Sequence, residues 1–318
     1  MRIVITGGGG FLGQRLARRL AREGRIGDQP VTELTLFDIV APPPPDAPFP
    51  VRSVAGDVAD LPANAMPMGT DIVFHLAAVV SAAAEADYDL GRRVNLRGTD
   101  AVVDSCRRLT RPPRVVFTSS VASFSAAPDE VIGPATRQVP ANSYGAQKAA
   151  AELILADATR RGFLDAVTLR LPTVSIRPGR PNKAASSFVS SILREPLGGE
   201  EAELPVADDF RLWITSPAHA TDWLLHAATL DTAAMGPDRS VNPPGLTVSV
   251  GEMLAALEAA KPGAAALVRR VAAPEIQAIV ATWPARFDPA RALALGFAAH
   301  GPLEALVAEF LAETRGAA

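Results

Sequence analysis

Short apolar runs alternate with amphipathic stretches through the first half of the chain. Residues 3–5 are apolar and lead into a glycine cluster, after which Leu12, Leu16 and Leu20 recur at a helical spacing with arginines between them. Further strands are expected at 33–39, 51–55, 72–76, 114–118 and 166–171, and helices at 95–109 and 143–161. Because apolar strands alternate with helices, the pattern predicts an α/β fold with a doubly wound parallel sheet, covered on both faces.

The pattern changes beyond residue 171. Prolines and glycines become frequent, and residues 177–209 show no clear period. Helices are expected again at 216–230, 249–260 and 301–313, with a strand at 266–271. We therefore expect residues 1–171 to form the sheet domain, to which 210–245 return, and 172–318 to form a smaller, mixed C-terminal lobe.

Composition and charge restrict the class of protein. The 318 residues carry a net charge of −3 with scattered Lys and Arg, so the basic field of a nucleic-acid binder is missing. No apolar run reaches the roughly 20 residues of a membrane span, and the N-terminus enters a strand directly, which leaves no room for a signal peptide. The single cysteine, Cys106, permits neither an internal disulfide nor a cysteine metal site. We expect a cytoplasmic protein that binds neither nucleic acid nor membrane.

A glycine cluster lies between the first strand and the first helix, in the sequence TGGGGFLG. Its glycines Gly7, Gly10 and Gly13 are three positions apart. Glycine lets the chain turn tightly and approach a phosphate closely, and the following helix N-terminus offers unpaired N–H groups. With a strand before it and a helix after it, the motif predicts a Rossmann-type dinucleotide site that includes Phe11 and Leu12. The alternative is a glycine turn without a ligand.

Residues after the next strands are expected to complete the cofactor site. Asp38 closes the second strand, where a carboxylate can accept hydrogen bonds from the adenosine ribose; no arginine follows it, which favours NAD over NADP. A solvated strand-end acid is the alternative for Asp38. Asp57, after the third strand, is expected to accept from the adenine amino group. The other residues assigned to this site are Val58, Leu76, Ala77, Ala78, Asn95, Thr118, Tyr144, Lys148 and Pro172.

Tyr144 and Lys148 are four positions apart, so they share one face of the helix expected there. An ammonium beside a phenol lowers the phenol pKa from about 10, which makes the phenol usable as a general base near neutral pH. Ser119 and Ser120 close the fifth strand, at the sheet edge where such folds bind ligands, and a hydroxyl there can donate to a substrate oxygen. Alone, each feature is better explained by a surface Tyr–Lys pair or a turn serine; their combination favours catalysis.

Together these motifs resemble the extended short-chain dehydrogenases and nucleotide-sugar epimerases. The matching segments are TGGGGFLG, the strand-end aspartate, and then GD, HLAA, VNLRGT, FTSSVASF, YGAQK and RLPTV, in that order along the chain. The resemblance implies that Tyr144 is the acid/base and Lys148 its partner. It also implies that Ser120 supplies the hydroxyl, with Ser119 as runner-up, and that Asn95 supports the helix and the proton relay. NAD is the implied cofactor, and a homodimer packed through the two long helices is usual.

Differences from the family pattern restrict the class of substrate that the resemblance implies. Phe124 and Ser125 replace a frequent Tyr-Gly, and RLPT at 170–173 replaces an arginine-x-x-asparagine type of segment, which weakens a sugar-nucleotide substrate. The stretches at 170–186 and 191–206 are instead similar to the D-erythronate dehydrogenases, which implies NAD-dependent oxidation of D-erythronate to 2-dehydro-D-erythronate. The alternatives are a nucleotide-sugar 4-epimerase or dehydratase with tightly bound NAD, and a redox-sensing binding protein without activity.

A small hydroxy acid needs a cation for its carboxylate and polar partners for its hydroxyls. Arg177 and Lys183 are the candidate carboxylate ligands, because they follow the sixth strand, where a pocket is expected. Ser81, Asn142 and Thr173 are the candidate hydroxyl partners, in addition to the catalytic serine. The alternative for the two cations is a solvated loop.

The histidines give no sign of a metal centre. His219 and His226 lie seven positions apart on an expected helix without acidic residues close by. His75 is surrounded by strand residues and has no carboxylate or nucleophile at triad spacing, so we expect it in the core. No metal is predicted.

Overall fold

The computed structural model describes residues 1–127, 129–179 and 186–315, and the chain divides into two compact units. The first unit consists of Met1–Ser120, Ser143–Arg170 and Thr221–Val241. The second consists of Val121–Asn142, Leu171–Ala220 and Asn242–Ala318. The second unit therefore takes up a segment from the middle of the first half, directly after the strand that ends in the two serines.

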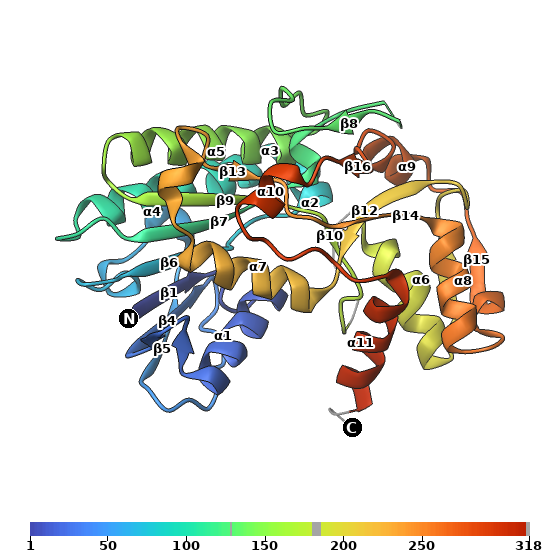
Figure 1. Cartoon of the computed structure of the whole chain (residues 1–318), viewed down its shortest axis with the longest axis horizontal. Helices are drawn as coiled ribbons and strands as arrows, with labels where there is room; N and C mark the ends of the chain where they lie inside the picture. Colours follow the sequence, from blue (N-terminus) through green and yellow to red (C-terminus); the bar gives the residue numbers. More distant parts are fainter. Residues whose placement is uncertain (128, 180–185, 316–318) are drawn as a thin grey trace. The chain divides into compact units, whose positions relative to one another are not determined.

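A seven-stranded sheet forms the centre of the first unit (Figure 1). Its order is β13-β9-β7-β6-β1-β4-β5, with parallel registers from β7 to β5 and between β13 and β9. The strands are β1 (Arg2–Thr6), β4 (Glu33–Asp38), β5 (Val51–Ala55), β6 (Ile72–His75), β7 (Arg114–Ser120), β9 (Asp165–Leu171) and β13 (Ser240–Val241). The predicted α/β fold with a parallel sheet is confirmed.

Helices cover both faces of this sheet. Figure 1 shows α4 and α5 on one face and α1 and α7 on the other, where Arg19 of α1 lies 3.5 Å from Asp222 of α7. The longer helices are α1 (Phe11–Glu23), α4 (Gly98–Arg107), α5 (Ser143–Arg160) and α7 (Pro217–Thr229), and the shorter elements are α2 (Ser81–Ala86), α3 (Tyr88–Gly91), η1 (Val58–Asp60), η2 (Ala63–Ala65), η5 (Thr232–Met235) and the hairpin β2 (Arg25–Ile26) and β3 (Gln29–Pro30). The helix expected at 95–109 begins earlier, with the π-helical turns of η3 (Arg92–Arg97).

The core under α4 and α5 fixes the helix that carries Tyr144. Val102 of α4 and Leu155 of α5 are fully buried, and they pack with Val115 and Phe117 of β7. Complete burial of each such side chain contributes about 1.5–3 kcal/mol, so α5 is held firmly against the sheet. Its first turn is thereby fixed next to the carboxyl end of β7.

The second unit has a three-stranded sheet of order β10-β12-β14, in which β10 (Thr173–Val174) pairs parallel and β14 (Leu246–Ser249) antiparallel with β12 (Arg211–Thr215). Two smaller sheets pair β11 (Ala202–Leu204) with β15 (Val268–Arg270), and β8 (Val131–Ile132) with β16 (Arg286–Phe287). The helices are η4 (Val121–Ser123), α6 (Ser187–Gly198), α8 (Val250–Ala260), η6 (Ala264–Leu267), α9 (Pro274–Val280), α10 (Ala290–Ala294) and α11 (Leu303–Arg315).

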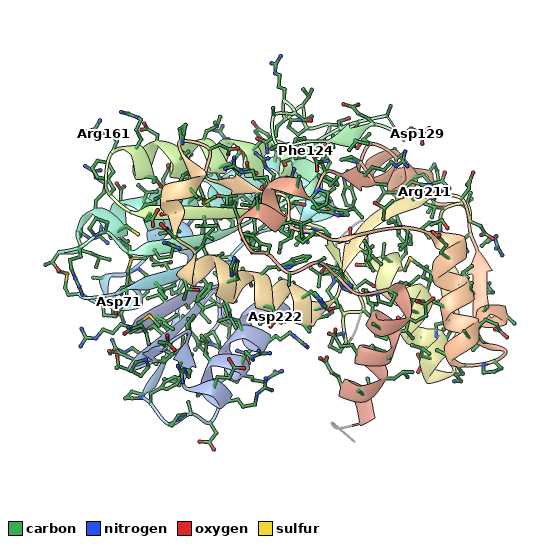
Figure 2. All side chains as sticks on the ribbon, viewed as in Figure 1. Asp71, Phe124, Asp129, Arg161, Arg211 and Asp222 are labelled. Carbon is green, nitrogen blue, oxygen red and sulfur yellow. The ribbon has the colours of Figure 1, made fainter. Side chains whose placement is uncertain are left out.

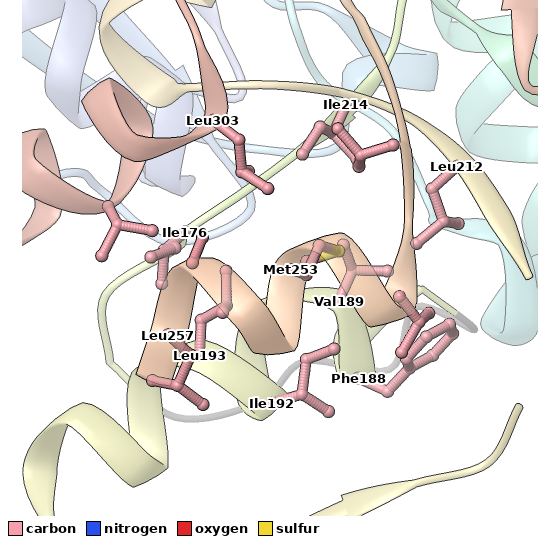
Figure 3. Packing of buried hydrophobic residues seen from close by; sticks show 14 of the residues in the cluster. Ile176, Phe188, Val189, Ile192, Leu193, Leu212, Ile214, Met253, Leu257 and Leu303 are labelled. Atoms are coloured by element: carbon pink, nitrogen blue, oxygen red, sulfur yellow. The ribbon is translucent and has the colours of Figure 1, made fainter. Parts of the chain in front are cut away.

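Helix α6 lies in the region that showed no clear sequence period. Its buried residues include Phe188, Val189, Ile192 and Leu193, which recur at the i, i+4 spacing of one helix face. Figure 3 shows this face packed beside α8. A proline at position 196 and the proline- and glycine-rich flanks concealed the pattern. The lack of a clear hydrophobic period in this region therefore did not exclude a helix.

Candidate functional site

The glycine cluster forms the turn between β1 and α1. Gly7 has φ +73°, and a Cβ atom there would lie 2.6 Å from Ala77 N. A Cβ atom on Gly13 would lie 2.9 Å from Gly8 Cα and closer still to Gly7 O. Both positions therefore require glycine. The N-cap, Gly10, makes no side-chain capping hydrogen bond, so the first N–H groups of α1, including those of the turn at residues 11–12, suit an anionic ligand.

A cleft of about 410 Å³ opens beside this turn, within the first unit. It brings together eight of the residues predicted for the cofactor: Gly7, Gly10, Asp38, Asp57, Val58, Leu76, Ala77 and Ala78. The remaining lining residues, which sequence reasoning missed, are Phe37, Ile39, Gly56, Val79, Leu90 and Val94. Most of them, Val94 included, directly neighbour a residue predicted for the cofactor site, but Leu90 lies on a helix that carries no cofactor motif. Pro172 belongs to the second unit and does not line this cleft.

Asp38 ends β4 with its carboxylate at the glycine turn. Its Oδ2 accepts a hydrogen bond from Gly9 N at 2.9 Å, and its Oδ1 accepts from Ile39 N at 2.7 Å. The carboxylate is thereby fixed where it lines the cleft. A fixed negative charge there suits the hydroxyls of an adenosine ribose and repels a 2′-phosphate.

Asp57 is tied to an arginine that sequence reasoning missed. Its Oδ1 accepts from Ala59 N at 2.8 Å, and its Oδ2 accepts from Arg93 Nε at 2.8 Å. Burial raises the pKa of Asp57, but the hydrogen bonds from Ala59 and Arg93 and the charge of Arg93 outweigh burial and hold the pKa below its ordinary value. No motif marks Arg93, because it meets Asp57 only through the packing of η3 against η1. The adenine contact of Asp57 stays a prediction.

His75 is a buried, neutral part of the core, as its strand neighbours indicated. Thr99 Oγ1 donates its hydrogen to Asn95 O at 2.8 Å, so it can only accept from His75 Nε2, which lies 3.1 Å away. The proton of the neutral ring is therefore on Nε2, and His75 Nδ1 accepts from Thr6 Oγ1 at 2.7 Å. Burial, with a smaller contribution from the charge of Lys148, lowers the pKa of His75 to about 3. The ring therefore links β1, β6 and α4 without titrating near neutral pH.

Asn95 joins three segments with one side chain. Its Oδ1 accepts from Val79 N at 2.9 Å, and its Nδ2 donates to Val79 O at 3.0 Å and to Gln147 Oε1 at 2.7 Å. Gln147 directly precedes Lys148 on α5. The amide thus ties η3 and the loop after β6 to the first turns of α5. Gln147 is a further residue that sequence reasoning missed, although it stands within the YGAQK motif.

Lys148 lies within reach of Tyr144, as the four-residue spacing predicted. Its Nζ is 5.7 Å from the centroid of the Tyr144 ring and 4.5 Å from that of Phe117, and it donates to Thr118 O at 2.8 Å. The lysine is 1% exposed. Burial lowers its pKa to about 7, although the charge of Glu152 acts in the opposite direction. A cation that releases its proton near neutral pH thus lies one helical turn from the phenol.

The two serines at the end of β7 differ in their surroundings. Ser119 is buried, and its hydroxyl donates to Glu152, which also accepts from Arg170 Nη2 at 2.7 Å and from Ser240 Oγ at 3.1 Å. Ser119 is therefore committed to a buried ionic network. Ser120 is only partly buried, so the geometry favours Ser120 over Ser119 for contact with a substrate. Glu152 was missed, although its i+4 spacing from Lys148 placed it on the same helix face.

The candidate substrate residues are distributed over both units. In the first unit, Ser81 begins α2 and is buried. In the second unit, Asn142 is partly buried and Thr173 begins β10. Thr173 lines a small cavity of the second unit, which Arg177 does not line. Lys183 lies outside the described residues, so its place is not given.

The backbone of Arg177 is anchored within the second unit. Its N–H donates to Ser190 Oγ at 3.1 Å, and its carbonyl oxygen accepts from Arg194 Nη1 at 2.7 Å. Among the described residues, no group of three or more His, Cys, Asp and Glu side chains could hold a metal ion. The same part of the chain contains no helix that is long and apolar enough to cross a membrane.

Comparisons with known proteins agree with this geometry. Residues 3–214 match the model of the NAD dependent epimerase/dehydratase family. A D-erythronate dehydrogenase of Cupriavidus necator is 46% identical over 98% of this chain and 98% of its own length, and one of Haemophilus influenzae is 40% identical over 98% and 99%. The crystal structure of a nucleoside-diphosphate-sugar epimerase from Agrobacterium tumefaciens is 42% identical, with a TM-score of 0.90 over 96% of this chain and 92% of that chain.

Proposed function

Because the chain belongs to the NAD dependent epimerase/dehydratase family, we propose that it is an NAD-dependent dehydrogenase that oxidises the small sugar acid D-erythronate to 2-dehydro-D-erythronate. The observation that carries this proposal is the identity of 46% and 40%, over nearly the whole chain, to two proteins named D-erythronate dehydrogenase. The reaction converts one secondary alcohol of the substrate into a ketone.

The residues of the first unit fit NAD. A Cβ atom at Gly7 or Gly13 would meet backbone atoms of the glycine turn or of residues 76–77, so glycine is required to keep this turn beside the N-terminus of α1, where a pyrophosphate would bind. Asp38 presents a fixed carboxylate to the cleft, as an adenosine ribose requires. When bound, NAD accepts the hydride that leaves the substrate carbon.

Proton transfer is assigned to the side chains at the start of α5. Tyr144 Oη takes the proton of the substrate hydroxyl as general base. Lys148, buried with a pKa of about 7, favours the phenolate when it is charged and can hold the nicotinamide ribose. Ser120 donates a hydrogen bond to the reacting oxygen, and Asn95 keeps η3 and α5 in place through Gln147.

A second candidate function is a nucleotide-sugar 4-epimerase or dehydratase that recycles tightly bound NAD. The observation in its favour is the 42% identity to a protein described as a nucleoside-diphosphate-sugar epimerase. Two relatives that carry the dehydrogenase name over nearly the full length outweigh this single similarity. Net formation of NADH separates the two functions, because an epimerase consumes no free NAD.

A screen for NAD reduction tests the proposed function. The purified chain is mixed with NAD and each of the four-carbon sugar acids, with UDP-glucose and UDP-galactose as controls, and absorbance at 340 nm is followed. We expect one NADH per D-erythronate oxidised and none with the UDP-sugars. Interconversion of the UDP-sugars, without NADH from any sugar acid, would establish the second candidate instead.

We also propose a cytoplasmic homodimer whose residues 172–318 form the substrate-binding lobe, except that only Thr221–Val241 of the expected segment 210–245 returns to the first domain. Support for a dimer comes from Leu153 on α5, which is 72% exposed although it is a large apolar side chain. Light scattering during gel filtration checks this proposal. The expected mass is twice the 33.2 kDa of one chain, and Leu153→Glu should shift it to that of a monomer.

A further inference from the structure

A second cavity lies within the second unit and takes no part in the cofactor site. Its polar lining consists of Thr173, Arg211 and Trp283, and Val121, Leu212 and Trp213 are among its apolar lining residues. The free space is about 10 Å³, which is the size at which a single water-sized group fits. Its first lining residue, Val121, directly follows Ser120 in the sequence.

Trp283 presents a polar atom that the described part of the protein does not satisfy. Its Nε1 is buried, and it has no hydrogen-bond partner among the described residues. An indole nitrogen can only donate, and a buried donor without an acceptor is unfavourable. The position therefore favours an occupant that brings an acceptor oxygen.

Arg211 supplies a positive charge to the same cavity. It begins β12 and is exposed (Figure 2). Within residues 1–127, 129–179 and 186–315 its side chain makes no hydrogen bond or ion pair. The charge of Arg211 contributes to lowering the pKa of Glu252, but the Glu252 carboxylate is already hydrogen-bonded to Ser249 in the capping box of α8. The guanidinium donors of Arg211 thus suit a carboxylate ligand.

An aromatic wall limits what the cavity can take. Trp213 stacks on Phe287 with ring centroids 3.7 Å apart, and Phe124 meets Phe287 edge-on at 6.0 Å. Gly245 allows this arrangement, since a Cβ atom there would lie 2.7 Å from Trp213 Nε1. Rings that pack against one another move little, so the cavity has room for one water-sized polar group and none for a diphosphate.

We propose that this cavity receives one carboxylate oxygen of a small hydroxy acid. The Arg211 guanidinium supplies the charge, and the Trp283 Nε1–H and Thr173 Oγ1 donate to that oxygen. The assignment deepens the proposed function and rests on it for the identity of the acid. It moves the carboxylate contact away from Arg177, which does not line the cavity.

Nuclear magnetic resonance of the indole N–H groups tests the proposal on the full chain with NADH bound. The protein has three tryptophans, and Trp283→Phe, which keeps an aromatic ring, identifies the Trp283 resonance. We expect D-erythronate to move that resonance downfield as the donor gains a charged acceptor. Erythritol, which lacks the carboxylate, should leave it in place. A resonance that stays in place during saturating D-erythronate overturns the subsite.

Kinetics of matched variants give a second readout. Trp283→Phe should raise KM for D-erythronate roughly ten- to hundredfold, the cost of one hydrogen bond to a charged group, with kcat within about threefold. Arg211→Gln should raise KM more, whereas Arg269→Gln, which removes an exposed arginine of β15 in the same unit, should leave it unchanged. Equal effects of the two arginine variants would refute the assignment.

The subsite and the proposed function can fail separately. If wild-type protein forms NADH from D-erythronate while the Trp283 resonance stays in place, the subsite is wrong and the function stands. If D-erythronate moves the resonance without any NADH being formed, the carboxylate subsite stands and the dehydrogenase function is wrong.

Discussion

Two small sets of polar groups, one in each unit, are bonded differently. In the first unit, His75, Asn95 and Glu152 are bonded to named partners on neighbouring elements. In the second unit, the buried Nε1–H of Trp283 has no partner among the described residues, and a nearby arginine makes no ion pair there. Satisfied networks fix catalytic side chains in advance, whereas unsatisfied donors suit a ligand that completes them. This contrast supports our proposals that the first unit carries the reaction chemistry and that the second unit contacts the acid.

Removal of the phenol hydroxyl should give the largest effect and act on the first unit alone. We expect Tyr144→Phe to lower kcat by about 10³-fold, because the general base is lost, while the Kd for NADH changes less than about threefold. Stopped-flow absorbance and NADH fluorescence measure the two quantities. The protein has one other tyrosine, Tyr88, which is 57% exposed, so Tyr88→Phe is the matched control and should keep normal turnover.

A methyl group added at the glycine turn should weaken cofactor binding, and we expect this to be the second largest effect. In Gly13→Ala the new methyl group meets the backbone of Gly7 and Gly8, so we expect the Kd for NADH to rise about a hundredfold. Gly198→Ala is the control, because a Cβ atom there meets nothing within 4 Å. An unchanged Kd in Gly13→Ala, measured by fluorescence titration, would mean that the dinucleotide does not bind at this turn.

The buried histidine of the first unit should make stability fall with acid. His75 has a pKa of about 3 in the folded protein, against an ordinary value of 6.5, so the unfolded chain binds more protons as pH falls below 6.5. The free energy of unfolding should drop by about 2 kcal/mol between pH 7 and pH 5 from this group alone. Urea unfolding of wild type and His75→Gln checks this, since the variant should lose that part of the slope. Identical slopes would contradict the assigned neutral core histidine.

The smallest effect is expected at the ribose carboxylate. Asp38→Asn keeps the size of the side chain but removes the charge, so KM for NAD should rise about tenfold and the preference for NAD over NADP should narrow. Initial rates with both coenzymes measure this change. Asp46→Asn, at an acid of the following loop that does not line the cleft, serves as the control. If Asp38→Asn keeps the wild-type preference for NAD over NADP, Asp38 does not determine which coenzyme binds.

Local patterns were sufficient to predict the first unit. The strands β1, β4, β5, β6, β7 and β9 are apolar runs, and their ends carry Asp38, Asp57 and the two serines, so their place at one sheet edge follows from parallel order. The Tyr144–Lys148 proximity is a consequence of helix geometry alone. Local pattern did not indicate the partners of these residues. Arg93 meets Asp57, and Glu152 meets Arg170, through packing between different elements rather than through spacing within one element.

The second unit could not be predicted in the same way. Thr173, Arg211 and Trp283 come from β10, from β12 and from the turn after α9, and no spacing in the sequence relates them. The amphipathic face of α6 was also missed, because proline and glycine around it concealed its period. Predictions of a substrate cation therefore fell on Arg177 and Lys183, which stood near a recognisable strand. A cavity built from single residues of distant segments has no motif.

Transfer of an isotope from the substrate tests the central claim most directly. The chain is incubated with NAD and D-erythronate that carries deuterium at C2, and the NADH formed is examined by mass spectrometry and nuclear magnetic resonance. The account predicts one deuterium at C4 of the nicotinamide ring for each 2-dehydro-D-erythronate produced. NADH without deuterium, or recovery of the labelled acid without any NADH, would contradict it.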